Sequence, residues 1–473
     1  MNVIETVALI QFLITIGAIT IGRVIYKLSP LVGLFSALLV CPVPIFVVGM
    51  SSAGFIYFSD LIGLLVLLVV LAKGRFDIST ISGGRVTYGM VVITLVIIPL
   101  VASIVTTMRD GNGDGRWILL GLFRGISYVF IFVAASKYAV DHPEKIKSVV
   151  CVQAITITSV CGIGILQFFL NLNLDLWNEY ANYDFTEWIG GFGHGFMGLY
   201  RGAIGAWTAG MAAVIISVTN RQRFGALLAA LFIIFGLAAN VLVGSRQGLV
   251  GTLIGLIISL ILGVRNKKNK IRSHSAGIFF SVTLIVGAAL LFGGNGISNQ
   301  TGDVGEWLGN RFDLFSSGSE TIDEAKNRDP RMPLILDRVA NAPENYLIGL
   351  GYGRVISEAM GSGLDLIYVD SELLWTLQQT GFIGIISYVL MIAIILSRVA
   401  KGGRRGGGGD QLDKIVMGGS LVCVGIFLTY GHFFLLHVQS SQAPVAYWNW
   451  LMLGFCMATP SHFRVNLKVE DEK

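Results

Sequence analysis

The stretch NVLVGSRQGLVGTLIGLI, Asn240 to Ile257, joins two apolar runs at Ser245-Arg246-Gln247. Each run continues without a charged residue for about the length of a membrane-spanning helix. No acid lies near Arg246 in the sequence, so its charge has no local counter-ion. The stretch therefore predicts two membrane helices that meet at the membrane boundary, with a guanidinium group placed at their junction.

The whole chain has the composition of this stretch. Hydrophobic residues make up 54% of the sequence and charged residues 13%, whereas soluble domains carry about 25% charged residues. We therefore predict an all-α polytopic membrane protein with about 13 transmembrane helices and one large extracytoplasmic helical loop. The predicted spans are 4–22, 30–50, 56–72, 87–107, 117–136, 148–170, 199–219, 225–243, 249–264, 276–293, 382–398, 415–435 and 443–459.

Three regions follow from this pattern. Residues 1–293 are expected to hold ten transmembrane helices, residues 294–381 the large extracytoplasmic loop, and residues 382–473 the last helices and a cytoplasmic tail. Lysine and arginine gather in alternate loops, such as RNKKNKIR (265–272), and such loops face the cytoplasm. The N-terminus is then outside and the C-terminus inside. The net charge of +5 reflects this topology and does not indicate nucleic-acid binding.

Arg124, Arg201 and Arg246 lie near the outer membrane boundary, where the charge rule does not account for them. Charged groups at such depth usually face a partner or a cavity, and a guanidinium matches the oxygens of a phosphate. The alternative is that each side chain reaches the membrane surface from a helix end. Asp60, an acid within the third span, is expected to pair with an arginine.

The predicted outer loop contains RMPLILDRVANAPENYLIGLGYGRVI (331–356). An amphipathic helix is expected over 333–342, ended by a turn at Pro343. Gly349-Leu-Gly-Tyr-Gly353 predicts a tight turn with close backbone approach, and its spacing is not that of a nucleotide-binding loop. A further helix is expected to begin at Asp370-Ser371 and to pass Gly381 into the membrane.

These features occur in a recognisable order: the Ser-Arg junction, an Arg331-x₆-Arg338 helix, the glycine-rich turn, a polar helix start and a membrane helix. With YRGAIGAW (200–207), the order resembles the O-antigen ligase and Wzy-type polysaccharide polymerase superfamily over roughly residues 195–395. The resemblance implies a GT-C type glycosyltransferase of the bacterial inner membrane that uses undecaprenyl-diphosphate-linked sugar at the outer face. It implies neither metal nor cofactor. The diphosphate would be bound by arginines, here Arg201, Arg246, Arg124, Arg331 and Arg338.

One departure from the ligases favours a polymerase. Ligases carry a histidine and an asparagine at the last polar helix start, where this chain reads Val369-Asp370-Ser371-Glu372. Glycosyl transfer requires a base that accepts the proton of the attacking hydroxyl, and Asp370 or Glu372 is the expected base. Direct attack would invert the anomeric carbon. The alternative is that Asp370 only caps the helix and Glu372 only interacts with its dipole.

His194, His432 and His437 are further candidates for substrate contact on the outer side. His432 and His437 are five residues apart, which is not the i, i+4 spacing of a helical zinc pair. The five cysteines all fall in apolar runs and are expected to be small core residues.

The expected function is polymerisation of undecaprenyl-diphosphate-linked oligosaccharide repeat units into O-antigen or exopolysaccharide. The expected partners are that lipid-linked oligosaccharide as donor and acceptor, membrane lipid, and the chain-length regulator and flippase of the same pathway. One alternative is a ligase that moves a finished glycan to a lipid or protein acceptor. Another, from a different class, is a transporter or flippase, although the internal repeat typical of transporters is not visible.

Overall fold

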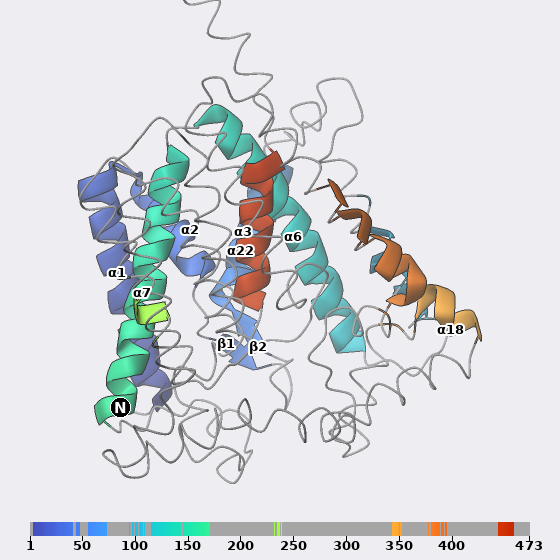
Figure 1. The fold of residues 1–473 in the computed structure, drawn as a ribbon, viewed down its shortest axis with the longest axis horizontal. Helices are drawn as coiled ribbons and strands as arrows, with labels where there is room; N and C mark the ends of the chain where they lie inside the picture. Colours follow the sequence, from blue (N-terminus) through green and yellow to red (C-terminus); the bar gives the residue numbers. More distant parts are fainter. Residues whose placement is uncertain are drawn as a thin grey trace, which may run out of the picture.

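The structure is a computed structural model, and it describes the chain in several parts (Figure 1). All structural statements concern these parts. The continuous stretches are 3–40, 44–47, 55–72, 115–142, 145–170, 343–349, 380–387 and 443–457, with Gly351 and further helical positions within 94–108, 231–238 and 377–394.

Helix α1 (Val3–Tyr26) packs against α2 (Pro30–Leu39) and α7 (Ile146–Leu170) to form the first group of helices (Figure 1). The α1–α7 contact is close because α1 carries a glycine there. A β-carbon added at Gly22 would lie 2.6 Å from Cγ2 of Val152.

Helix α6 (Gly115–Asp141) forms the second group with α3 (Phe58–Ala72) and α22 (Ala443–Met457). The contact between α6 and α22 is the most extensive in the described residues, although about 300 residues separate the two helices in the sequence. Helix α2 touches α3 and α22 and so connects the two groups.

The connection between α1 and α2 shows how the chain stops and restarts a helix. Lys27 adopts a left-handed backbone with φ of 50°, and the amide of Leu28 donates to the carbonyl of Gly22 at 3.2 Å. Ser29 then caps α2 by accepting a hydrogen bond from the amide of Val32 at 3.4 Å. Pro30 follows at the first helical position, where a missing amide proton costs nothing.

The described part of the chain is almost entirely helical, as predicted, and its exception is a short antiparallel hairpin that precedes α3. Strand β1 (Pro44–Val47) pairs with β2 (Phe55–Tyr57). Residues 30–50 were expected to form one span, but the helix in this range ends at Leu39. Pro42 and Pro44 oppose a continuing helix, and β-branched residues such as Ile45 and Val47 favour a strand.

Elsewhere the expected spans that fall on described residues are helical. Helices α1, α3, α6, α7 and α22 lie where hydrophobic runs predict them, and the described positions within 94–108, 231–238 and 377–394 are helical too. The remaining predicted spans, 199–219, 249–264, 276–293 and 415–435, lie outside the described residues.

Within the described residues one segment, Leu122–Ala139 of α6, is long and apolar enough to cross a membrane by length and composition. Shorter apolar helices include Phe12–Ile25, Phe58–Val69 and Ser148–Ile163. The core helix of a soluble protein meets the same criterion. The arrangement of about 13 membrane spans and the three-region division of the chain therefore stay predictions.

Candidate functional site

A buried ion pair joins α3 to α6. Arg124 Nε donates to Asp60 Oδ1 at 3.0 Å, and Nη2 donates to Oδ2 at 2.9 Å. The two side chains are 1% and 0% exposed. This parallel two-bond geometry is the strongest arrangement of an arginine and a carboxylate. The expectation that Asp60 pairs with an arginine is confirmed.

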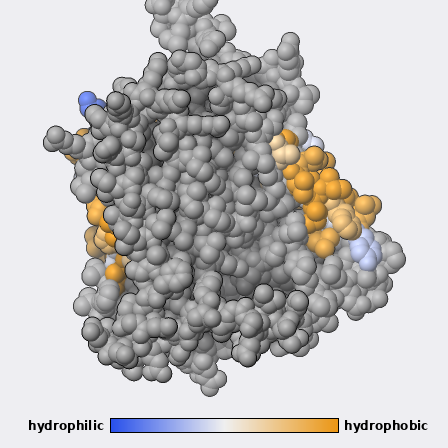
Figure 2. Space-filling view, in the orientation of Figure 1, coloured by the Kyte–Doolittle hydropathy of each residue, from blue (hydrophilic) through white to orange (hydrophobic). Residues whose placement is uncertain are grey.

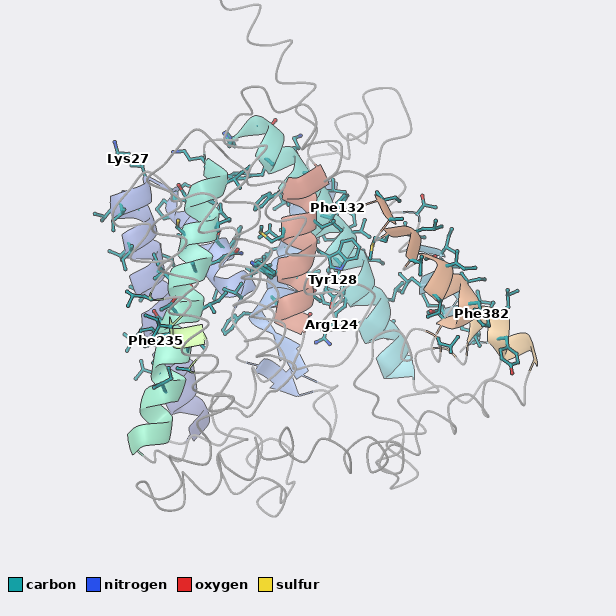
Figure 3. All side chains as sticks on the ribbon, viewed as in Figure 1. Lys27, Arg124, Tyr128, Phe132, Phe235 and Phe382 are labelled. Atoms are coloured by element: carbon teal, nitrogen blue, oxygen red, sulfur yellow. The ribbon has the colours of Figure 1, made fainter. Side chains whose placement is uncertain are left out.

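The two partners occupy different positions along their helices. Asp60 lies in the first turn of α3, directly after the β1–β2 hairpin, where the helix dipole favours a negative charge. Arg124 lies nearly three turns into α6. The pair is therefore located towards the hairpin end of the second helix group (Figures 1 and 3).

Ser127 and Tyr447 pack against Gly63, about one turn of α3 after Asp60, and Tyr128 contacts Tyr447. A β-carbon at Gly63 would lie 2.8 Å from Ser127 Cβ and 3.0 Å from the hydroxyl oxygen of Tyr447. The rings of Tyr128 and Tyr447 meet edge to face, with centroids 4.7 Å apart. Helices α3, α6 and α22 thus each contribute polar side chains to one buried cluster.

An aromatic column extends from this cluster along the α6–α22 contact. The rings of Tyr128 and Trp450 are stacked with centroids 6.3 Å apart, and Phe132 meets Trp450 edge to face at 6.2 Å. Figure 3 shows Arg124, Tyr128 and Phe132 following one another along α6 towards α22. Because these side chains are almost fully buried, they hold the two helices at a fixed distance and rotation.

The geometry of the Asp60–Arg124 ion pair suits a structural contact and does not suit a catalytic base. A catalytic base must lie within hydrogen-bond reach of the proton that it accepts. Both oxygens of Asp60 instead accept from Arg124, and the carboxylate is buried. Asp60 is therefore no candidate for the base in this arrangement.

The described end of the large loop packs onto the next predicted span. Pro343, expected to form a turn, instead begins the short helix α18 (Pro343–Ile348), because proline is well tolerated at a first helical position. That expectation was wrong. The expected close-approach turn after it is supported: Gly349 and Gly351 have φ of 75° and 81°, values that favour glycine.

The turn at Gly349 packs against Gly381. A β-carbon at Gly381 would lie 2.6 Å from the amide nitrogen of Gly349 and from the carbonyl of Leu347. The rings of Tyr346 and Phe382 stack beside it, with centroids 6.3 Å apart. Gly381 itself has φ of 61°, a value that favours glycine, and the described residues 380–387 are helical, while the expected helix start at Asp370 lies outside the described residues.

Most predicted site residues lie outside the described residues, and their roles stay predictions. This holds for Arg201, Arg246, Arg331, Arg338, Asp370, Glu372, His194, His432 and His437. Arg124 is described and pairs with Asp60, and its role in diphosphate binding stays a prediction. No pattern in the sequence predicted a role for Gly63, Ser127 or Tyr447.

Cys151 and Cys161 are buried in α7 and form no disulfide, as expected for small core residues. Among the described residues, no group of three or more histidine, cysteine or acidic side chains is arranged to hold a metal. The sequence matches no protein-family model and no curated protein.

Proposed function

We propose that the chain is a multi-spanning membrane glycosyltransferase. Within that class, we propose a polymerase that joins undecaprenyl-diphosphate-linked oligosaccharide repeat units into O-antigen or exopolysaccharide. It acts at the outer face of the bacterial inner membrane, with its N-terminus outside and its C-terminus in the cytoplasm. The proposal rests on the sequence resemblance and on three features of the described residues.

The observation that carries the proposal is the contact between α18 and Gly381. The resemblance places a glycine-rich turn and a glycine at a membrane-helix start at two separate points of the chain. The Gly349 amide and the Leu347 carbonyl lie against Gly381, so the two points are in contact. This contact supports the proposal because it brings two parts of the resemblance together.

Exposed apolar faces support a membrane environment. Exposed side chains on α1 follow the spacing of one helix face, Leu9, Phe12, Leu13 and Ile16. A similar face on α3 contains Leu61, Leu65, Leu68 and Val69. Figure 2 shows hydrophobic atoms on both flanks of the molecule, over α1 and beside α18. Lipid contact accounts for such faces, since soluble monomers rarely expose contiguous apolar patches of this extent.

The contact between two basic connections supports the predicted topology. Lys145 Nζ donates to the carbonyl oxygen of Lys27 at 3.3 Å. The charge rule assigns both residues to cytoplasmic loops, and the structure brings these loops together. Asp60 and Arg124, which the sequence assigns to the outer half of their helices, are also in contact.

The proposed chemistry is metal-independent inverting transfer. Arg201 and Arg246, with Arg331 and Arg338 of the loop, stabilise the negative charge that develops on the leaving diphosphate. Asp370 accepts the proton of the acceptor hydroxyl, which then attacks the anomeric carbon directly. Donor and acceptor are both lipid-linked, so the growing chain stays at the membrane surface.

A deletion of the gene in its native host separates this function from the two alternatives. Loss of a polymerase leaves single repeat units on undecaprenyl diphosphate at the outer face, where an added periplasmic glycosidase reaches them. Loss of a ligase leaves long polymer on the lipid carrier. Loss of a flippase leaves single units that become accessible only after the membrane is opened. The second or third pattern would reject the polymerase.

A further inference from the structure

We propose that Arg124 is the counter-ion of Asp60 and belongs to a clamp joining α3, α6 and α22, so that the diphosphate site does not include it. The inference deepens the proposed function and rests on it, because it narrows the set of arginines that bind the leaving group. It also assigns Asp60 a role that the sequence resemblance does not supply.

The first observation behind this inference is which nitrogens of the Arg124 guanidinium donate to Asp60. Nε and Nη2 of Arg124 form one edge of the fork, and both atoms donate to Asp60. That edge is one of the two edges by which a guanidinium can match two phosphate oxygens, the other being Nη1–Nη2. To bind a diphosphate through the Nε–Nη2 edge, Arg124 would first have to release the carboxylate.

Burial makes such a release unfavourable. Asp60 is 0% exposed, so removing Arg124 would leave a buried carboxylate without its counter-ion, one of the most destabilising changes in a protein interior. The α3 dipole stabilises the charged form of Asp60, so the acid remains a competitor for the guanidinium. Arg124 is itself only 1% exposed.

Helix α22 contributes the third set of contacts to the clamp. The Tyr447 hydroxyl of α22 and Ser127 of α6 both pack against Gly63, which follows Asp60 by about one turn of α3. Tyr128, which follows Arg124 by about one turn of α6, meets the Tyr447 ring. The ion pair and the tyrosine pair thus link α3 to α6 and α6 to α22 at the same level of the helix group.

A thermodynamic cycle tests the clamp on the full chain purified in detergent. The variants are Asp60→Asn, Arg124→Gln and the double variant, and the first measurement is the melting temperature. Each single variant leaves one buried charge and is expected to melt well below the wild type. The double variant is expected to recover at least half of that loss, because two neutral amides remain. Additive losses in the double variant would overturn the clamp.

Polymer formation from extracted lipid-linked repeat units is the second measurement, normalised to folded protein. The double variant is expected to keep kcat and KM within about threefold of the wild type. If Arg124 touches the diphosphate, Asp60→Asn stays active, whereas Arg124→Gln and the double variant both lose polymer formation. That pattern would overturn the inference.

Ser136→Ala is the matched control, since it removes another buried contact of α6, the bond to the Gly454 carbonyl. It lies about 18 Å along the helix from Arg124 and should show no coupling to Asp60→Asn. If the wild type forms no polymer, the proposed function fails. The melting cycle still decides whether Asp60 and Arg124 form the clamp.

Discussion

The hydroxyl of Ser136 on α6 donates a hydrogen bond of 2.9 Å to the backbone carbonyl of Gly454 on α22. A side chain reaches another helix's backbone in this way only where the two helices lie very close together. Gly454 permits this approach, because a β-carbon there would lie 2.5 Å from the carbonyl oxygen of Phe132. The α6–α22 contact is therefore sensitive to a single added methyl group.

Gly454→Ala is expected to destabilise the protein by about 2 kcal/mol or more, because the methyl group meets rigid backbone and forces the helices apart. The melting temperature in detergent measures the effect. Gly17→Ala is the control, since no atom lies within 4 Å of the added methyl in the middle of α1. There the better helix propensity of alanine should stabilise by up to about 1 kcal/mol. Equal effects of the two substitutions would contradict the close packing of α6 and α22.

Lys27→Gly is expected to stabilise the protein by roughly 1 kcal/mol. The φ of 50° at Lys27 is strained for a residue with a β-carbon, and glycine adopts it freely. The carbonyl that accepts from Lys145 is retained. A thermal melt against the wild type measures the gain, with Lys27→Ala as the control that keeps the strain. A lower melting temperature for the glycine variant would argue against the left-handed connection.

The topology predicts which introduced cysteines react in intact cells. Ser317→Cys, in the predicted outer loop, should react with a membrane-impermeant maleimide without any treatment. Ser273→Cys, at the end of RNKKNKIR, should react only after the membrane is permeabilised. The reverse pattern would invert the proposed orientation and move the large loop to the cytoplasm.

Arg246→Ala is expected to abolish polymer formation while the protein still inserts in the membrane. Lysine at this position should restore little activity, because a point charge lacks the two-pronged geometry of the guanidinium. Arg23→Ala is the control, since Arg23 lies exposed in the last turn of α1, at the predicted cytoplasmic end. Near-normal polymer from Arg246→Ala would leave that arginine as a simple helix-end residue.

Asp370→Asn is expected to lower the rate by about 10²–10⁴-fold, the usual contribution of a general base. Asparagine caps a helix as well as aspartate does, so the melting temperature should hardly change. Glu372→Gln is the control and should have a smaller effect. The assay is polymer formation from purified lipid-linked repeat units. An active and stable Asp370→Asn protein would assign the base to another residue, with Glu372 and His194 as the next candidates.

The helices were predicted well where an uninterrupted hydrophobic run was the dominant feature of the sequence. Uninterrupted hydrophobic runs located α1, α3, α6, α7 and α22 to within a few residues. The same signal failed at residues 44–47, which form strand β1, where hydrophobicity continues but prolines and β-branched residues oppose a helix. At Pro343 the opposite error occurred, because proline both ends helices and starts them.

The sequence predicted that Asp60 would pair with a cationic side chain, since a buried acid in an apolar helix requires a cation. The identity of that cation was not, because three arginines lie at a similar predicted depth. Gly63 and Tyr447 were not predicted either. Their roles depend on how α3 and α22 approach each other, and no pattern within one helix specifies a contact between segments almost 400 residues apart.

The bond between Lys145 and Lys27 restricts how the chain can be threaded through a bilayer. Two points of a chain that touch on one side of a membrane are separated by an even number of crossings, because an odd number would put about 30 Å of hydrocarbon between them. The predicted spans between them are 30–50, 56–72, 87–107 and 117–136. With 56–72 and 117–136 crossing, that number is even if the stretch around 94–108 and the 30–50 region both cross the bilayer, or if neither does. In a membrane-spanning chain, the 3.3 Å contact therefore argues against any topology in which only one of these two regions crosses.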